Sequence, residues 1–204
     1  MNKEMPDWAA IVLAAGRSER FGAPKVLQSF KGIPFLTRIR KHLQVVGIFK
    51  IVLVLGHQAD DLVEQLPEKE PFKIVVNENY QLGQMSSLQK GLQAIQTSVK
   101  GVLMCLVDQP HVSLSVYQQL LQTAVQHHNQ FLIPEFKGRG GHPIIIPADF
   151  FQEILDTDAR KFTLKDVLRL NHEFVRRVNV NDSAILEDID TKEMLKLLEK
   201  KYSK

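Results

Sequence analysis

The chain has 204 residues, and this length predicts one domain, which we expect to cover residues 1–204. Apolar residues make up 44% of the chain and charged residues 24%, which excludes a disordered or a fibrous protein. The net charge is only +3, and the basic residues are interspersed with acids. We therefore expect no nucleic-acid partner, whereas small anions remain candidate partners.

The only cysteine, Cys105, excludes an internal disulfide bond and a cysteine-ligated metal site within one chain. The longest apolar run, residues 8–15, is shorter than the roughly 18–20 residues that cross a bilayer. Residues 1–7 carry acids and a proline where a signal peptide has apolar residues. We therefore expect a cytoplasmic protein without a membrane partner.

Strand and helix patterns alternate through the first part of the chain. Short apolar runs predict buried strands at residues 9–13, 51–55, 72–76 and 101–107. Apolar residues at helical spacing predict helices at residues 36–46, 59–66, 85–95 and 113–124. This alternation predicts a parallel sheet covered by helices, which is the α/β class.

The pattern changes after residue 130. Residues 131–136 and 142–146 flank the sequence KGRGG and predict a small antiparallel excursion. The remaining expected elements are two helices, a strand and a last helix, at residues 148–155, 163–170, 173–180 and from Thr191. The sheet is therefore expected to be mostly parallel.

A glycine-containing, basic loop follows the first strand at residues 13–25, which read LAAGRSERFGAPK. In open α/β sheets, ligands bind at the carboxyl ends of the strands. Glycines let backbone N–H groups approach a phosphate, and arginine and lysine side chains add positive charge there. The spacing matches neither a P-loop nor a dinucleotide fingerprint. We expect Gly16, Arg17, Arg20, Gly22 and Lys25 to hold a triphosphate at the carboxyl end of the strand.

The loop resembles LAAGxSxRxGxPK, the signature of the MobA-like NTP transferases, which include the molybdenum cofactor guanylyl- and cytidylyltransferases. Four further segments resemble blocks of this family in the expected order: GQMSSL (83–88), VDQP (107–110), RGGHP (139–143) and DIDT (188–191). The resemblance extends over nearly the whole chain. It implies a three-layer, Rossmann-like nucleotidyltransferase fold. It also implies that the loop binds the nucleotide, with Leu13, Ala14 and Ala15 joining the glycines and cations of the loop.

The sequence LAAG at residues 13–16 is similar to the cytidylyltransferase branch, since guanylyltransferases tend to read LAGG there. The GHP block resembles the same branch. This resemblance implies transfer of CMP from CTP to the phosphate of molybdopterin, with release of pyrophosphate. The chain departs from the branch at Phe21, where methionine is usual, and at residues 157–160, which lack a glycine often found there.

Two alternatives to this function remain. The acceptor is alternatively an isoprenoid precursor, a sugar phosphate or another phosphorylated small molecule. The protein is alternatively a non-catalytic chaperone that binds molybdenum cofactor on the same fold. Retention of Lys25, Asp108 and Asp190 favours an enzyme, because a binding module does not require all three. The resemblance also implies transient contact with a molybdoenzyme or its chaperone.

Nucleotidyl transfer brings two anions together, and Mg²⁺ held by carboxylates and phosphates neutralises them. Asp108 follows the fourth predicted strand, and the resemblance implies that Asp108 and Asp190 are metal ligands. Asp188 lies two residues from Asp190, on the same face of an extended stretch, so the second ligand is open between them. Alternatively, Asp190 and Thr191 cap the last helix. The expected catalytic residues are Lys25, Arg17 and Asp108.

Gly83, Ser86 and Ser87 lie at the start of a predicted helix, and we expect them to contact the nucleotide. The alternative is that the two hydroxyls only cap the helix. Gly141 and His142 are expected to contact the acceptor. The alternative for His142 is a structural place in its loop.

Overall fold

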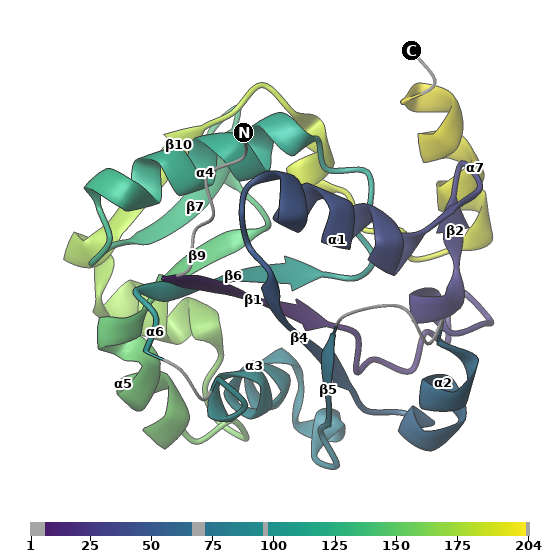
Figure 1. Cartoon of the computed structure of the whole chain (residues 1–204), viewed down its shortest axis with the longest axis horizontal. Coiled ribbons are helices and arrows are strands. Elements are labelled where there is room, and N and C mark those ends of the chain that lie inside the picture. Colours follow the sequence, from purple (N-terminus) through teal and green to yellow (C-terminus); the bar gives the residue numbers. More distant parts are fainter. Residues whose placement is uncertain (1–6, 67–71, 96–97, 203–204) are drawn as a thin grey trace.

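An eight-stranded mixed sheet forms the centre of the computed structural model, which describes residues 7–66, 72–95 and 98–202 (Figure 1). Its strands are β1 (Trp8–Leu13), β4 (Lys50–Leu55), β5 (Lys73–Val76), β6 (Gly101–Leu106), β7 (Phe131–Phe136), β8 (Arg139–Gly140), β9 (Ile144–Pro147) and β10 (Val175–Asn179). The strand order is β10-β7-β9-β6-β1-β4-β5, with β8 paired to β7. Residues 1–6, 67–71, 96–97 and 203–204 of the expected domain lie outside the described residues.

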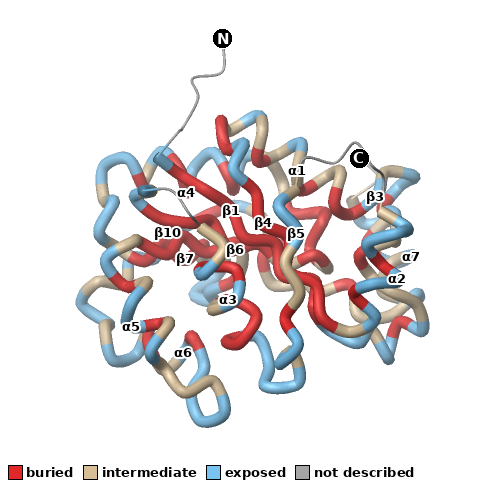
Figure 2. The backbone as a smooth tube through the Cα atoms, turned by 60° about the horizontal axis from the view of Figure 1, so that its bottom comes forward, coloured by how far each residue is buried: buried red, intermediate tan, exposed pale blue. Residues whose placement is uncertain are grey.

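Helices cover both faces of the sheet, α1 and α4 on one face and α3, α5 and α6 on the other (Figure 1). Their bounds are α1 (Phe35–Val45), α3 (Gln84–Gln93), α4 (Leu114–Gln126), α5 (Phe151–Asp156) and α6 (Leu164–Leu170). In β1, Ala10 and Val12 pack into the core under α1 and α4, while Ala9 and Ile11 pack into the core under α3. The central strands are buried (Figure 2). The predicted three-layer α/β fold is confirmed.

The antiparallel excursion is also confirmed. β8 pairs antiparallel with β7, and β9 then inserts between β6 and β7, antiparallel to both. The strand begins at Ile144 rather than at residue 142, because the N–H of His142 donates outside the sheet, to the carbonyl oxygen of Ile185, and Pro143 has no N–H to donate.

The carboxyl ends of β1 and β6 point toward three further elements (Figure 1). These are α2 (Ala59–Gln65), α7 (Lys192–Lys201) and a hairpin of β2 (Ser29–Phe30) and β3 (Ile33–Pro34). The sequence predicted only a polar loop at the hairpin, because two-residue strands are too short to show an alternating pattern. Lys31 and Gly32 make its turn with φ of +51° and +72°.

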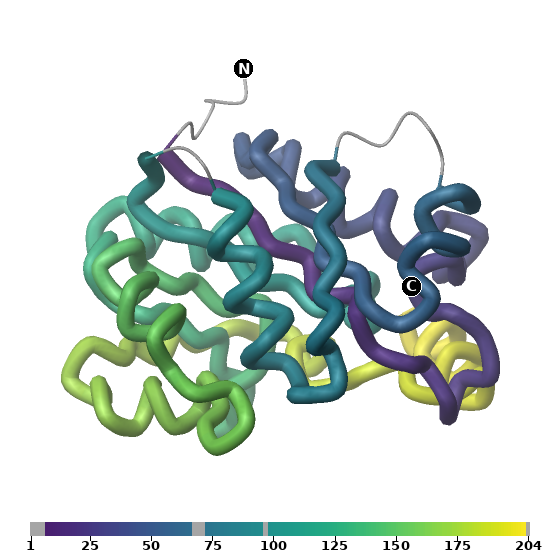
Figure 3. Tube along the Cα trace, turned by 90° about the horizontal axis from the view of Figure 1, so that it is seen from below, coloured from purple at the N-terminus to yellow at the C-terminus, as the bar shows by residue number. Residues whose placement is uncertain are grey.

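The loop after β1 runs beside the segment that leads into α7, at the opposite end of the sequence (Figure 3). This proximity brings the N-terminal basic loop to the C-terminal acidic block. Among the described residues, the longest helix is α4 with 13 residues, and none is long and apolar enough to span a bilayer.

Candidate active site

A pocket of about 660 Å³ opens at the carboxyl edge of the sheet, between the loop after β1 and the end of β6. Most residues predicted for the site line it: Leu13, Ala14, Ala15, Gly16, Arg17, Arg20, Lys25, Gly83, Ser87, Asp108, Asp188 and Asp190. Gly22, Ser86, Gly141 and His142 are not among the lining residues.

The loop is held by its own turns and by the neighbouring strand. The N–H of Ala14 donates to the carbonyl oxygen of Val54 at 2.9 Å, which fixes the start of the loop to β4. Gly22 has a φ of +74°, and its N–H donates to the Ser18 carbonyl oxygen at 3.0 Å. Position 22 therefore requires glycine, because other residues rarely adopt a positive φ. A Cβ at Gly16 would meet no atom within 4 Å, so that glycine leaves open space at the pocket.

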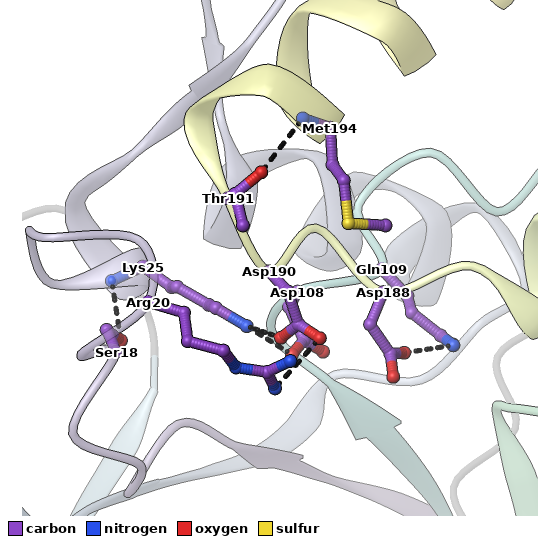
Figure 4. Close-up of polar contacts among 9 residues, drawn as sticks. All are labelled: Ser18, Arg20, Lys25, Asp108, Gln109, Asp188, Asp190, Thr191 and Met194. Atoms are coloured by element: carbon purple, nitrogen blue, oxygen red, sulfur yellow. Dashed lines mark hydrogen bonds and ion pairs between the residues drawn. The ribbon is translucent and has the colours of Figure 1, made fainter.

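Lys25 joins the two acidic residues predicted as metal ligands (Figure 4). Its Nζ lies 2.8 Å from Asp108 Oδ2 and 2.7 Å from Asp190 Oδ1. Arg20 adds a second cation, with its guanidinium 2.9 Å from Asp190 Oδ2. The Lys25 side chain is 12% exposed, and those of Asp108 and Asp190 are 21% and 23% exposed. The two ion pairs of Lys25 are therefore only weakly screened by solvent.

The surroundings shift the pKa of each group. Burial raises the pKa of Asp108 above its ordinary value, although the Lys25 ammonium opposes this. Burial also acts on Asp190, but Lys25 and Arg20 outweigh it and lower the pKa of that carboxyl. For Lys25, burial is outweighed by the two carboxylates, which raise its pKa. We infer a charged lysine held by carboxylates at neutral pH.

Asp188 is oriented by the residue that follows Asp108. Gln109 Nε2 donates to Asp188 Oδ1 at 2.9 Å (Figure 4). The N–H of Ile189 donates to the carbonyl oxygen of Asp108 at 2.9 Å, which ties the acidic block to the end of β6. The cap of α7 is Thr191, whose Oγ1 accepts from the N–H of Met194 at 3.1 Å. Asp190 is therefore not the cap.

The donor set fits a magnesium ion shared with phosphates. Asp108 and Asp188 each have one carboxylate oxygen that accepts no hydrogen bond from the described residues. Within the same described part of the chain, no three or more His, Cys, Asp or Glu side chains are gathered closely enough to hold a metal ion. Mg²⁺ usually takes one or two carboxylates and completes its coordination with water and substrate phosphates. The residues suit an ion that arrives with a nucleotide.

Ser86 and Ser87 do not cap α3, whose N-cap position is Gly83. Instead, Asn77 Nδ2 donates to Ser86 Oγ at 2.9 Å and to Ser87 Oγ at 3.0 Å. The Ser86 hydroxyl in turn lies 2.8 Å from the Gly83 carbonyl oxygen, so Ser86 supports the turn beneath the pocket. Sequence reasoning missed Asn77, although its place directly after β5, at a carboxyl strand end, is the signal that could have found it.

Tyr80 and His57 form a wall of the pocket. The sequence left open whether His57, after Gly56 at a predicted strand end, borders the pocket, and it gave no sign of Tyr80. His57 Nδ1 and the Tyr80 hydroxyl lie 3.2 Å apart, and the Arg17 guanidinium carbon lies 6.0 Å from the centre of the Tyr80 ring. Arg17 is 49% exposed and pairs with Glu19 at 3.2 Å. Its side chain is therefore mobile enough to turn toward an incoming anion.

Gly141 and His142 lie against Ile185, and His142 is near enough to Asp108 to interact with its charge. A Cβ at Gly141 would overlap the carbonyl group of Ile185, so the close backbone contact requires glycine. Burial lowers the pKa of His142 to about 4, partly opposed by Asp108, and the imidazole is neutral at pH 7. The acceptor-binding role of both residues stays a prediction.

The fold and this pocket define a nucleotide-binding α/β transferase. Residues 10–177 match the model of the MobA-like NTP transferase domain, and the chain belongs to that family of nucleotidyltransferases.

The relatives of the chain are named for different activities. The chain is 28% identical to nicotine blue oxidoreductase from Paenarthrobacter nicotinovorans, a match that covers 94% of this chain and 96% of that protein. It is 23% identical to molybdenum cofactor cytidylyltransferase from Escherichia coli (strain K12), covering 89% and 90%. The structure of Rv0371c from Mycobacterium tuberculosis H37Rv has a TM-score of 0.81 at 23% identity, covering 95% and 98%. Rv0371c is also known in complex with manganese.

Proposed function

We propose that the protein transfers CMP from CTP to the phosphate of molybdopterin and releases pyrophosphate. The observation that carries this proposal is the contact of Lys25 with Asp108 and Asp190 in a pocket at the end of the LAAG loop. The choice of CTP rests on the resemblance of residues 13–16 and of the GHP block to cytidylyltransferases. One relative of nearly full length carries that name.

In this reaction, an oxygen of the acceptor phosphate attacks the α-phosphorus of CTP. One phosphorus–oxygen bond forms, and the bond to the β-phosphate oxygen breaks on the opposite side. The chain supplies no covalent intermediate and works by holding two anions in line. Lys25, Arg17 and Arg20 are placed to neutralise the triphosphate and the pyrophosphate that leaves.

Bound Mg²⁺ would supply further charge neutralisation at the α-phosphate and the leaving pyrophosphate. Asp108 would hold it together with Asp188 or Asp190. Gln109 donates to one oxygen of Asp188, which lines the pocket, and Thr191 rather than Asp190 caps α7. Rv0371c, which shares this fold, binds manganese, and this supports a divalent ion at the site.

We expect the enzyme to work in the cytoplasm and to deliver its product to a molybdoenzyme or its chaperone. Burial raises the pKa of Cys105 to about 12, so its thiol is unreactive. A chain with one unreactive cysteine is compatible with a reducing compartment. We further propose that residues 1–204 act as one domain and that His142 and Gly141 lie on the acceptor side of the site.

The test is a panel of CTP, GTP and ATP against several phosphorylated acceptors, with pyrophosphate release as the readout. We expect release from CTP and Mg²⁺ only with a molybdopterin-type acceptor. Preference for GTP would overturn the base assignment, and turnover with a sugar phosphate or an isoprenoid precursor would overturn the acceptor. Binding of the cofactor without release from any nucleotide would instead indicate the chaperone.

A second candidate is a reduction like the one named for the relative from Paenarthrobacter nicotinovorans, which covers 94% of this chain. Its test is loss of nicotine blue colour in the presence of NADH or NADPH. We expect no loss above the rate without protein, because the paired Lys25 and carboxylates suit phosphate chemistry. A protein-dependent loss would favour this candidate.

A further inference from the structure

Lys25 occupies one carboxylate oxygen of Asp108 and one of Asp190, the two residues predicted as metal ligands. Its Nζ lies within 2.8 Å of Asp108 Oδ2 and within 2.7 Å of Asp190 Oδ1, and Arg20 contacts the other oxygen of Asp190 at 2.9 Å. Both oxygens of Asp190 are therefore engaged by cations of the chain. A metal ion that bridges Asp108 and Asp190 therefore has to displace Lys25 or Arg20 from an oxygen of Asp190.

We propose, on the basis of the proposed function, that Lys25 and Arg20 are exchangeable counter-ions of the metal site. In the free enzyme they neutralise the carboxylates and keep divalent ions weakly bound. A triphosphate in the pocket draws both cations away and leaves the carboxylates to the metal. Nucleotide and metal consequently bind with positive cooperativity.

The charges support an exchange of this kind. Asp108, Asp188 and Asp190 bring three negative charges to the pocket, and Lys25 and Arg20 bring two positive ones. Arg17 and Glu19 also line the pocket and pair with each other, so one net negative charge is left. One net negative charge is a weak attraction for a divalent ion. When Lys25 and Arg20 turn to the phosphates, all three negative charges face the metal ion. Binding of the nucleotide therefore strengthens binding of the metal ion, and binding of the metal ion strengthens binding of the nucleotide.

The geometry allows the movement of Lys25. Its backbone N–H is fixed by Ser18 Oγ at 3.2 Å, whereas the two carboxylates are the only hydrogen-bond partners of its Nζ in the described part of the chain. The same side chain lines the pocket together with Gly16 and Arg17. A rotation about side-chain bonds is therefore enough to carry the charge from the acids to a phosphate, without a change in the backbone.

The experiment measures Mn²⁺ binding by the loss of the spin-resonance signal of free Mn²⁺, without nucleotide or acceptor. We expect Lys25→Met to bind Mn²⁺ about 10-fold more tightly than the wild type, because a positive charge between the ligands is gone. Lys25→Arg keeps the charge and should bind as weakly as the wild type. Arg17→Met removes a pocket cation that contacts Glu19 instead, and should also leave Mn²⁺ affinity unchanged.

Equal Mn²⁺ affinity in Lys25→Met and the wild type would overturn the proposal. If Lys25→Met does not fold, as judged by its thermal unfolding, Arg20→Gln replaces it, since Arg20 is 76% exposed. That variant should bind Mn²⁺ a few-fold more tightly, and an unchanged affinity would overturn the proposal equally.

A second arm adds CTP and subtracts the Mn²⁺ that CTP binds without protein. CTP should tighten Mn²⁺ binding to the wild type more than to Lys25→Met, and equal tightening would contradict the exchange. No acceptor takes part, so a wrong acceptor in the proposed function leaves both arms unaffected.

Discussion

Asp108 stands where the charges of the site meet. It lies two residues after the end of β6, its carboxylate holds Lys25 at 2.8 Å, and its carbonyl oxygen accepts from the N–H of Ile189 in the acidic block. The carboxylate of Asp108 therefore acts in the chemistry of the site, whereas its carbonyl group acts in the structure. Asparagine has the same shape without the charge, so Asp108→Asn tests the first role and leaves the second intact.

We predict that Asp108→Asn lowers the rate of pyrophosphate release by about 10²–10³, the scale for losing one charge-stabilising group. The backbone bond to Ile189 is unchanged, so the variant should fold. Asp60→Asn, an exposed acid on α2, serves as the control and should keep the full rate. A near-wild-type rate for Asp108→Asn would remove this residue from the site.

Two neighbouring serines should respond differently to the loss of a hydroxyl. Ser86→Ala removes an acceptor for Asn77 and should lower the free energy of unfolding by about 1–2 kcal/mol, with KM for CTP unchanged. Ser87 lines the pocket, so Ser87→Ala should raise KM for CTP by about 3- to 10-fold. Urea unfolding and steady-state kinetics on both variants check this, and the opposite pattern would show that Ser86 contacts the nucleotide.

At the scale of elements, α7 fixes the acidic block from the downstream side. Thr191 caps the helix, and Lys201 Nζ near its end lies 2.6 Å from Glu187 Oε1, just before the acids. The Tyr202 ring packs against His111 with ring centres 5.3 Å apart. A loosened α7 would therefore displace Asp188 and Asp190 together.

The free energy of unfolding should depend on pH through His111, the residue against which the Tyr202 ring at the end of α7 packs. This side chain is 5% exposed, neither ring nitrogen has a partner among the described residues, and burial lowers its pKa to about 4. An unfolded histidine has a pKa of about 6.5, so between pH 7 and pH 5 the unfolded chain binds a proton that the folded chain does not. Acidification over this range therefore favours unfolding, by about 1–2 kcal/mol from His111 alone.

We predict that His111→Phe reduces the fall in unfolding free energy between pH 7 and pH 5 by this amount, measured by urea unfolding. His128→Gln changes an exposed histidine and should leave the fall unchanged. An identical pH dependence of the wild type and His111→Phe would show that His111 does not carry this effect.

At the scale of the whole molecule, a net charge of +3 conceals a strong local order. Lys25 is separated from Asp108 by 83 positions and from Asp190 by 165, yet the parallel sheet brings all three to one edge. Parallel strands have their carboxyl ends at the same edge of the sheet, and the hydrogen bond from the Ile189 N–H to the Asp108 carbonyl oxygen brings Asp190 to that edge. A small total charge is therefore compatible with a site built for a highly charged substrate.

The same reasoning explains what could be predicted from the sequence. Buried strands and amphipathic helices show their periods locally, so the layers were predictable, and the LAAG loop marked the site. The interaction of Lys25 with both acids could not be derived from spacing, because it depends on tertiary contacts. The β2–β3 hairpin was too short to show a period, and Asn77 and Tyr80 are single polar residues in turns. Ser86 was expected in the pocket, but the turn before α3 places its hydroxyl against Gly83.

The proposed reaction transfers CMP, which carries the α-phosphorus of CTP, to an acceptor in the pocket of Lys25 and Asp108. The most direct measurement follows CTP labelled at the α-phosphorus, incubated with Mg²⁺, a molybdopterin-type acceptor and the wild-type protein or Asp108→Asn. We predict that the label appears in the acceptor, in step with unlabelled pyrophosphate, and that Asp108→Asn slows this by about 10²–10³. Label that stays in CTP, or that appears as free CMP without entering the acceptor, would contradict nucleotidyl transfer by this protein.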